Sequence, residues 1–299
     1  MNQIVRFSDV TARDGLQSLS KVISPSNRIR LINSLKKLKF NEIEVGSIVN
    51  PKVIPTMANS LDVYKSTLDN SAKSYLLIGN NHGIDIINKN KIKHFSLFSS
   101  PSDSFNKANI NVNVKQSFER FQNMLFNLDK KSNHHIKGYI SCISDCPFEG
   151  DVPVKNILKT IYYYSYLGVD EICIADTIGT LQPSKLEKIL KESSKFFGHD
   201  KLSLHLHTNN ETISQEITKN NLKVAVENGI LKFDTSLFGI GGCPAVYNKN
   251  NVTKSGNLDI KDAIKYLSEF GCEFSENYNS DSWNRELQNV EETFRPIIF

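Results

Sequence analysis

The sequence predicts an α/β protein that forms a closed (β/α)8 barrel, and two observations lead to this prediction. Segments of strand character alternate with segments of helical periodicity, and eight strands over roughly 265 residues match the usual size of such a barrel. The first strand is not followed by the Gly-rich phosphate-binding turn that an open doubly wound sheet would usually have. A closed barrel is therefore the best account of the alternation.

The eight predicted strands are short apolar segments bounded by Gly, Asn, Asp or Pro. Each is rich in Val, Ile, Phe, Tyr or Ser, as strands buried in a sheet are. They cover residues 4–8, 42–49, 74–79, 94–99, 137–143, 171–175, 202–207 and 232–237.

Five segments between or after these strands have the spacing of amphipathic helices. The first of them places Ile29, Ile32 and Leu35 on one face. Pro183 stands where the first turn of a helix tolerates proline, and Gly168 stands where a helix ends. The predicted helices cover residues 25–39, 154–167, 183–197, 211–228 and 259–270.

One barrel domain, residues 1–272, accounts for most of the chain. No internal repeat and no low-complexity linker interrupts it. The remaining residues, 273–299, are predicted to form a short C-terminal appendage that packs outside the barrel.

The composition excludes several classes of protein. Apolar residues make up 39% and charged residues 23%, and a net charge of +4 over 299 residues is too small to indicate nucleic acid as a partner, although it suits an anionic ligand. No run reaches the roughly 18 apolar residues of a membrane span, and the first residues resemble neither a signal nor a transit peptide. Five cysteines are too few for a disulfide scaffold. We therefore expect a cytoplasmic protein without nucleic acid or membrane as a partner.

Polar residues gather at the carboxyl ends of the predicted strands. In a (β/α)8 barrel these ends and the loops after them form the active face, so the pattern predicts an enzyme site. The residues are segment 11–17 after the first strand, Glu44 on the second, Asp176 and Thr177 after the sixth, His205 and His207 on the seventh, and segment 239–244 after the eighth.

His205 and His207 are separated by one residue on a strand, so both imidazoles point to the same side, here the barrel lumen. With Asp14 from another strand end they form a candidate metal site with open positions. The alternative is that both histidines fill the barrel interior through hydrogen bonds. Nitrogen and oxygen ligands without cysteine favour Mg²⁺ or Mn²⁺, and Zn²⁺ also remains open.

Arg13 stands beside Asp14 and would place a fixed positive charge next to this metal site. Such a charge suits the stabilisation of a developing oxyanion or enolate. The alternative is a structural salt bridge between Arg13 and Glu44, and both roles are compatible. Asp176 and Glu44 are candidates to orient the histidines or Arg13.

Cys243 lies in a glycine-rich turn after the last predicted strand. No Ser-His-Asp or Cys-His-Asn set accompanies it, so proton transfer is favoured over nucleophilic attack. The alternative is a small buried apolar side chain.

The motifs in these positions resemble successive blocks of the 3-hydroxy-3-methylglutaryl-CoA (HMG-CoA) lyase family. This family belongs to the metal-dependent acyl-lyase and aldolase barrels, and the similarity runs in order from about Val5 to Gly271. The blocks are Arg13-Asp-Gly-Leu-Gln17, Glu42-Ile-Glu-Val-Gly-Ser47 with Pro51-Lys52, Ser141-Cys-Ile-Ser-Asp-Cys-Pro-Phe-Glu-Gly150, Ala175-Asp-Thr-Ile-Gly179, His205-Leu-His207, Phe233-Asp-Thr-Ser236 with Gly241-Gly-Cys-Pro244, and Gly256-Asn-Leu258.

The resemblance implies a retro-Claisen cleavage of HMG-CoA to acetoacetate and acetyl-CoA. It implies that Asp14, His205, His207 and Asn257 hold the divalent cation, and that a base among Asp14, His205 and Asp176 deprotonates the C3 hydroxyl. It further implies that Arg13 stabilises the enolate, that Cys243 protonates it, and that Gln17 and Thr177 contact the substrate. The partner molecule is an acyl-CoA, and a homodimer is an open option.

Some positions depart from the family pattern. Ser18-Leu19-Ser20 replaces Asn-Glu-Lys, Thr208-Asn-Asn-Glu211 replaces Asp-Thr-Tyr-Gly, and the segment from Cys243 to Asn257 is longer than usual. These changes keep open a related aldolase or acyl-CoA condensing enzyme with another substrate. A barrel that binds without catalysis would have lost Asp14 or the histidines, and all of them are present.

Overall fold

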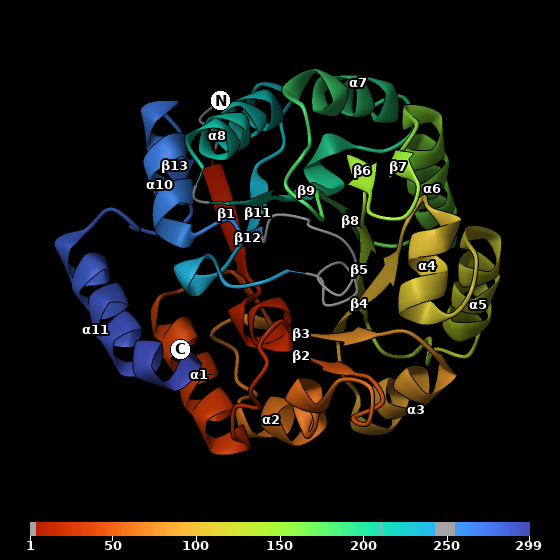
Figure 1. Cartoon of the computed structure of the whole chain (residues 1–299). Coiled ribbons are helices and arrows are strands. Elements are labelled where there is room, and N and C mark those ends of the chain that lie inside the picture. Colours follow the sequence, from red (N-terminus) through yellow and green to blue (C-terminus); the bar gives the residue numbers. More distant parts are fainter. Residues whose placement is uncertain (1–3, 210, 243–254) are drawn as a thin grey trace.

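The computed structural model describes residues 4–209, 211–242 and 255–299. Eight parallel strands close into a barrel, because each strand pairs with the next one along the sheet and β11 pairs with β1 (Figure 1). The predicted fold class is therefore confirmed. The barrel strands are β1 (Ile4–Asp9), β2 (Glu42–Ile48), β3 (Lys73–Ile78), β4 (His94–Ser99), β5 (His135–Ile140), β8 (Glu171–Ala175), β9 (Leu202–His205) and β11 (Lys232–Thr235).

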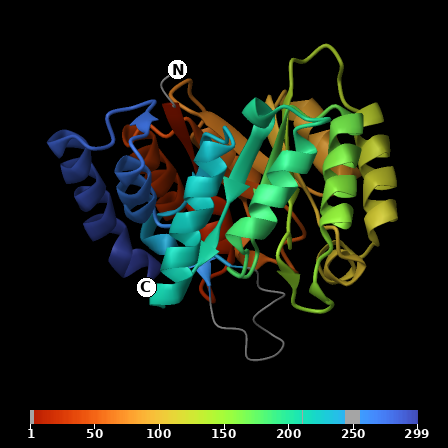
Figure 2. The same cartoon turned by 90° about the horizontal axis from the view of Figure 1, so that it is seen from above.

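Helices surround the barrel, and the view from above shows them flanking the strands (Figure 2). Asparagine and serine begin several of them: the side chain of Asn80 accepts a hydrogen bond from the backbone N–H of Gly83, and Ser280 accepts one from Trp283. The helices are α1 (Pro25–Lys37), α2 (Ser60–Ser66), α3 (Asn81–Asn90), α4 (Asp103–Ile110), α5 (Val114–Phe126), α6 (Val154–Leu167), α7 (Pro183–Ser193), α8 (Thr212–Glu227), α10 (Ile260–Glu269) and α11 (Asp281–Ile298).

Side chains alternate along each strand, so that one set faces the apolar core between the strands and the helices and the other set faces the inside of the barrel. On β2, Ile43 and Val45 belong to the apolar core under the helices, whereas Glu44 between them bonds to residues of other strands inside the barrel. On β5, Lys137 and Tyr139 likewise meet polar partners inside the barrel. The lumen is therefore filled by paired charges and hydrogen bonds, which buried ionic groups require.

The predicted strands 94–99 and 171–175 and the predicted helix 154–167 match the structure exactly. The predicted strand 202–207 is interrupted: β9 ends at His205, and β10 (His207–Thr208) pairs antiparallel with β12 (Gly256–Asn257). The predicted helix 183–197 ends earlier, at Ser193. A short hairpin of β6 (Asp145–Cys146) and β7 (Gly150–Asp151) follows β5.

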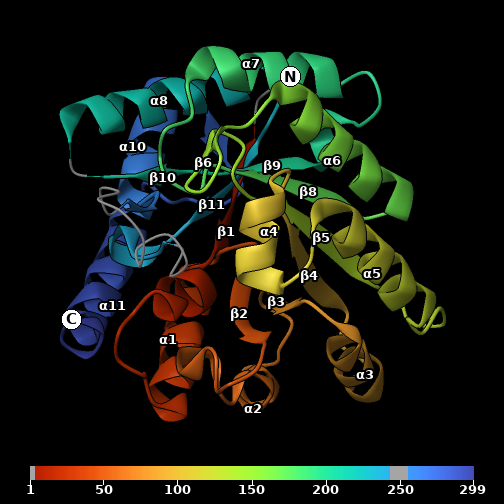
Figure 3. The same ribbon diagram turned by 45° about the vertical axis from the view of Figure 1, so that its right-hand side comes forward.

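The C-terminal residues lie on the outside of the barrel. β13 (Glu273–Phe274) pairs with the first residues of β1, and α11 packs against α1 (Figure 3). The indole N–H of Trp283 donates a hydrogen bond to the carbonyl of Leu38 (2.9 Å), and the hydroxyl of Tyr278 donates one to the carbonyl of Lys39 (3.0 Å). In the described part of the chain, no helix has the length and apolar character needed to cross a membrane.

Candidate active site

A tight turn after β1 presents Arg13 and Asp14 at the mouth of the barrel. The turn spans Thr11–Gly15 and is held by Asp9, whose carboxylate accepts hydrogen bonds from the backbone N–H (2.9 Å) and the hydroxyl (2.8 Å) of Thr11. The same hydroxyl accepts a bond from the backbone N–H of Leu237, after β11. The first and last strands of the barrel thus fix this turn together.

Asp9 gives the protein a pH-dependent stability. Burial raises the pKa of Asp9 to about 7, against the bonds from Thr11 that lower it, whereas an unfolded aspartate ionises near pH 4. Between about pH 4 and pH 7 the unfolded chain releases a proton that the folded protein keeps. Folding therefore becomes less favourable as the pH rises, by on the order of 4 kcal/mol at most.

We expect the free energy of unfolding of the metal-free wild type, relative to that of Asp9→Asn, to fall between pH 4 and pH 7. Urea unfolding of both proteins near pH 4 and pH 7 measures this difference. A free energy of unfolding that changes equally with pH in both proteins would contradict the prediction.

Asp14, His205 and His207 come together as the sequence predicts. One potential ligand atom from each lies within 4.8 Å of the others, and the two histidine Nε2 atoms are 3.0 Å apart. Burial lowers the pKa of His207, and the neighbouring His205 lowers it further, to about 4. Burial raises the pKa of Asp14, but Arg13 and the two histidines outweigh it and lower this pKa. A neutral imidazole and an ionised carboxylate are the protonation states that a metal ligand needs.

Asn257 adds an oxygen to this cluster. Its Nδ2 donates to Asp14 Oδ2 (3.0 Å) and to the carbonyl of Ile240 (2.8 Å), while its buried Oδ1 has no hydrogen-bond partner among the described residues. A Cβ on Gly241 would lie 2.9 Å from Asp14 Oδ2, so only glycine allows this close approach of the backbone. The unpartnered oxygen and the mixed oxygen and nitrogen donors fit a divalent cation.

Asp234 orients His205, a role that the sequence analysis did not assign to it. Its Oδ2 lies 3.1 Å from His205 Nδ1, so His205 donates from Nδ1 and keeps the lone pair of Nε2 for the cluster. Asp234 also accepts bonds from Lys137 Nζ (2.8 Å) and the Tyr139 hydroxyl (3.0 Å). Although burial raises the pKa of Asp234, Lys137 and His205 outweigh it and lower this pKa. The signal that could have identified it is a carboxylate in the middle of a predicted barrel strand, where a buried charge needs a partner.

Asp176 has another role than the one predicted. Its carboxylate accepts bonds from the Ser144 hydroxyl (2.6 Å) and from the backbone N–H groups of Gly179, Thr180 and Leu181. These partners hold the loop after β8. The prediction that Asp176 orients a histidine is therefore corrected, because Asp234 is the carboxylate at His205.

Two matched variants test this assignment. Asp234→Asn removes the acceptor charge at His205, and we expect it to weaken Mn²⁺ binding by roughly 10- to 100-fold, as loss of such a partner typically does. Asp176→Asn changes a carboxylate of equal burial that does not contact the histidine, and we expect Mn²⁺ affinity to change much less. Calorimetric titration with Mn²⁺ compares the two. Equal losses would return the orienting role to Asp176.

Arg13 forms the ion pair with Glu44 that the sequence allowed. Its Nε donates to Glu44 Oε2 and its Nη1 to Asp14 Oδ1, both at 2.5 Å, and the guanidinium lies 5.4 Å from the centre of the Tyr139 ring. Ser96 donates a further bond to Glu44. Burial lowers the pKa of Arg13, but Glu44 and Asp14 outweigh it and raise this pKa. Arg13 thus carries a charge of fixed position at the cluster.

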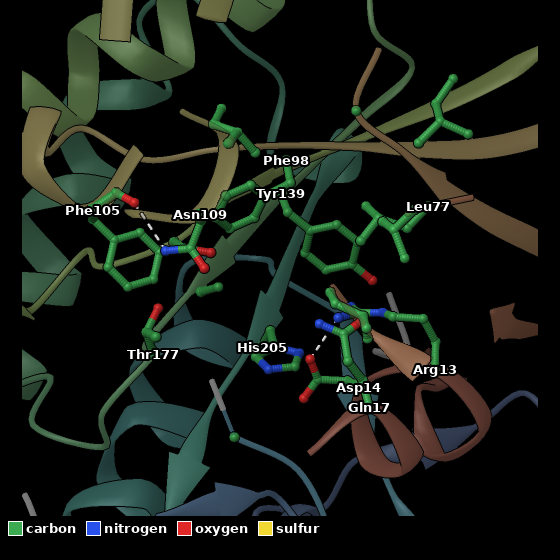
Figure 4. Close-up of a pocket in the computed structure, with 18 of the residues that line it drawn as sticks. Arg13, Asp14, Gln17, Leu77, Phe98, Phe105, Asn109, Tyr139, Thr177 and His205 are labelled. Atoms are coloured by element: carbon green, nitrogen blue, oxygen red, sulfur yellow. Dashed lines mark hydrogen bonds and ion pairs between the residues drawn. The ribbon is translucent and has the colours of Figure 1, made fainter. Parts of the chain in front are cut away.

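One cavity of about 160 Å³ unites most predicted site residues (Figure 4). Gln17 lines it with an Oε1 atom that has no hydrogen-bond partner among the described residues, and the Thr177 hydroxyl accepts a bond from the backbone of Cys142 (2.8 Å). Cys243 lies outside the residues that the structure describes. The predicted residues that line the cavity are Arg13, Asp14, Gln17, Thr177, His205 and His207.

Known proteins share this architecture and sequence. The chain is 30% identical over 265 residues to the 3-hydroxy-3-isohexenylglutaryl-CoA/hydroxymethylglutaryl-CoA lyase of Pseudomonas aeruginosa, with 88% of this chain and 85% of that protein covered. It is 31% identical over 270 residues to the hydroxymethylglutaryl-CoA lyase of Pseudomonas mevalonii, covering 90% and 86%.

Solved structures agree. An HMG-CoA lyase from Acinetobacter baumannii in complex with coenzyme A and 3-methylmalate superposes with a TM-score of 0.87 at 26% identity, covering 99% of this chain and 92% of that chain. The sequence also matches the HMGL-like family over residues 4–289. The chain therefore belongs to the HMGL-like family, which is the family of the HMG-CoA lyases.

Proposed function

We propose that this protein is a carbon–carbon lyase that cleaves HMG-CoA to acetoacetate and acetyl-CoA. The observation that carries the proposal is the position of Arg13, which is ion-paired to Asp14 in the cavity that also contains His205 and His207. A fixed positive charge beside a metal-type cluster suits a reaction that releases an enolate. The relatives named as hydroxymethylglutaryl-CoA lyases over most of the chain support the same reaction.

Asp14, His205, His207 and Asn257 would hold a divalent cation, with Mg²⁺ or Mn²⁺ favoured by a mixed set of oxygen and nitrogen donors without cysteine. When bound, such a cation polarises the substrate oxygens and lowers the pKa of the C3 hydroxyl. Asp234 holds the proton of His205 on Nδ1, so that Nε2 is free to bind the cation. Asn257 and Asp14 hold each other in place through their mutual bond.

The bond cleavage begins when a base removes the proton of the C3 hydroxyl. The oxygens of Asp176 already accept four hydrogen bonds, and His205 has its proton on Nδ1 and its Nε2 lone pair directed to the cation site, which leaves Asp14 as the better candidate. The C3 oxygen then forms a carbonyl, and the electron pair of the broken carbon–carbon bond becomes the enolate of acetyl-CoA. Arg13 stabilises this enolate, and Cys243, assigned from its sequence position, protonates it to complete the reaction.

Release of acetoacetate from HMG-CoA by the purified protein with Mg²⁺ or Mn²⁺ tests the proposal. We expect activity that EDTA abolishes and that either cation restores. Turnover of another acyl-CoA but not of HMG-CoA would favour the related aldolase or condensing enzyme. Binding of acyl-CoA without any cleavage would favour a barrel that has lost catalysis.

A further inference from the structure

A short turn after β11 contains a phenylalanine in a strained backbone conformation. The turn is Leu237–Gly239, and Phe238 within it has a φ angle of 60°, in the left-handed region. This region disfavours a residue with a Cβ atom by roughly 5- to 30-fold, and glycine is its usual occupant. Such a residue persists only where the surrounding structure holds it in place. Phe238 therefore needs contacts that offset its strain.

The C-terminal helix provides these contacts. The guanidinium of Arg295, in the last turn of α11, lies 4.7 Å from the centre of the Phe238 ring. The ring of Phe299 meets the ring of Phe238 edge-on, with 5.6 Å between centres. A cation over an exposed aromatic face contributes about two- to fivefold, and an aromatic pair about two- to tenfold. Together the two contacts are large enough to offset the strain of Phe238.

The same turn is bonded to two parts of the candidate cation site. The backbone N–H of Leu237 donates to the hydroxyl of Thr11 (2.8 Å), in the turn after β1 that presents the carboxylate of the cluster. The carbonyl of Ile240 accepts a hydrogen bond from Asn257 Nδ2 (2.8 Å). Phe238 stands between these two contacts along the chain. A change in the backbone of Phe238 would therefore move the carbonyl that fixes Asn257.

We propose that Phe238 is a positioning residue of the cation site, and that Arg295 of the C-terminal helix holds it in place. The inference rests on the proposed function, because it concerns the site that would hold the divalent cation. None of the described residues that line the cavity comes from α11. The C-terminal helix would thus act on the cation site without touching the ligand. If the contact is lost, a fraction of the molecules leaves the binding-competent conformation, and the apparent affinity falls accordingly.

The competing interpretation is that the contact only fastens α11 to the barrel. The helix has other contacts for this purpose, because Trp283, Leu287 and Phe294 are buried on its inner face. The indole of Trp283 is also bonded to the carbonyl of Leu38. Loss of one exposed contact at Arg295 leaves all of these in place. A variant of Arg295 can therefore separate the fastening of the helix from the positioning of the site.

The first experiment is calorimetric titration of Arg295→Gln with Mn²⁺. The substitution removes the charge, and we expect the Kd for Mn²⁺ to rise about two- to fivefold while the melting temperature changes little. Arg285→Gln is the matched control, because Arg285 is exposed on the same helix and donates to the carbonyl of Asp281 (3.3 Å). Wild-type Mn²⁺ affinity in Arg295→Gln, with or without a loss of thermal stability, would overturn the proposal.

The second experiment compares Phe238→Leu with Phe238→Tyr. Leucine keeps an apolar side chain and the strained backbone but removes the aromatic face, and we expect the Kd for Mn²⁺ to rise about tenfold. Tyrosine keeps the ring, so we expect it to bind Mn²⁺ as the wild type does. Equal losses in both variants would overturn the proposal.

The double variant Arg295→Gln/Phe238→Leu tests whether the two residues act through one contact. We expect it to bind Mn²⁺ no more weakly than Phe238→Leu alone, because the contact that Arg295 makes is already gone. Losses that add fully would mean that Arg295 does not act through Phe238, and would overturn the proposal.

Mn²⁺ binding and cleavage of HMG-CoA are measured separately, so the inference and the proposed reaction can fail independently. Weaker Mn²⁺ binding in the variants, with no cleavage by the wild type, would support the positioning role and reject the reaction. Normal cleavage by the wild type, with unchanged Mn²⁺ affinity in the variants, would reject the positioning role and keep the reaction. A raised KM for HMG-CoA with unchanged Mn²⁺ affinity would make Phe238 a substrate contact and overturn the proposal.

Discussion

Asp14→Asn is expected to abolish metal-dependent turnover almost completely. Asp14 contributes the carboxylate of the candidate metal site and is also ion-paired to Arg13, so one substitution affects both features. Asparagine keeps the shape of the side chain but removes its negative charge. We expect Mn²⁺ affinity to fall at least about 100-fold, and kcat/KM for HMG-CoA to fall by about three orders of magnitude.

Titration with Mn²⁺ and acetoacetate release measure the two effects. Asp151→Asn is the matched control, because the Asp151 side chain is 76% exposed, and its partner is Lys185 outside the cluster. A variant that binds Mn²⁺ normally would remove Asp14 from the metal site. Full metal affinity with lost turnover would make Asp14 the base instead of a ligand.

The sequence predicted the barrel well because its strands are short apolar runs with clear boundaries. Segment 171–175 is an example, since every residue of β8 is buried and its neighbours end the run. The interruption after His205 was not predictable from the pattern. It depends on the pairing of His207 with Asn257, which are 50 positions apart along the chain (257 − 207 = 50). Hydrogen bonds between such distant segments leave no local periodicity.

The structure brings the predicted residues Asp14, His205 and His207 together, and it differs from the prediction in which carboxylate faces His205. Asp176 and Asp234 both stand near the carboxyl ends of strands, so the sequence alone does not separate them. The register of the sheet decides, because β11 pairs with β9 so that Asp234 lies beside His205. Asp176 is in the loop after β8, where its partners are backbone N–H groups.

The buried lysine of the lumen was missed for a similar reason. Lys137 is 2% exposed and lies between Asp234 (2.8 Å) and Glu171 (3.3 Å). In a helical or strand pattern a lysine is read as a solvent-facing residue, because an unpaired buried ammonium is very unfavourable. Its two partners come from strands β8 and β11, so only the closed barrel shows that the charge is compensated.

The effect of Arg13→Met is expected to fall on the chemical step. The charge of Arg13 is held in place by Glu44 and Asp14 before the substrate arrives, so no reorganisation is needed when the enolate forms. We expect kcat to fall by at least about 100-fold with a small change in KM, because the lost interaction is made mainly in the transition state. Arg13→Lys keeps the charge but not the planar fork that reaches two carboxylates, so we expect it to restore only part of the rate.

Arg13→Met also leaves Glu44 buried without its cationic partner, and the loss of stability from this must be separated from the loss of catalysis. The double variant Arg13→Met/Glu44→Gln removes both charges, and we expect its thermal stability to recover towards that of the wild type while kcat stays low. Thermal unfolding and steady-state kinetics of the single and double variants measure this difference. Recovery of kcat together with stability would reduce Arg13 to a structural salt-bridge residue, because the enolate would then form equally well without a positive charge beside it.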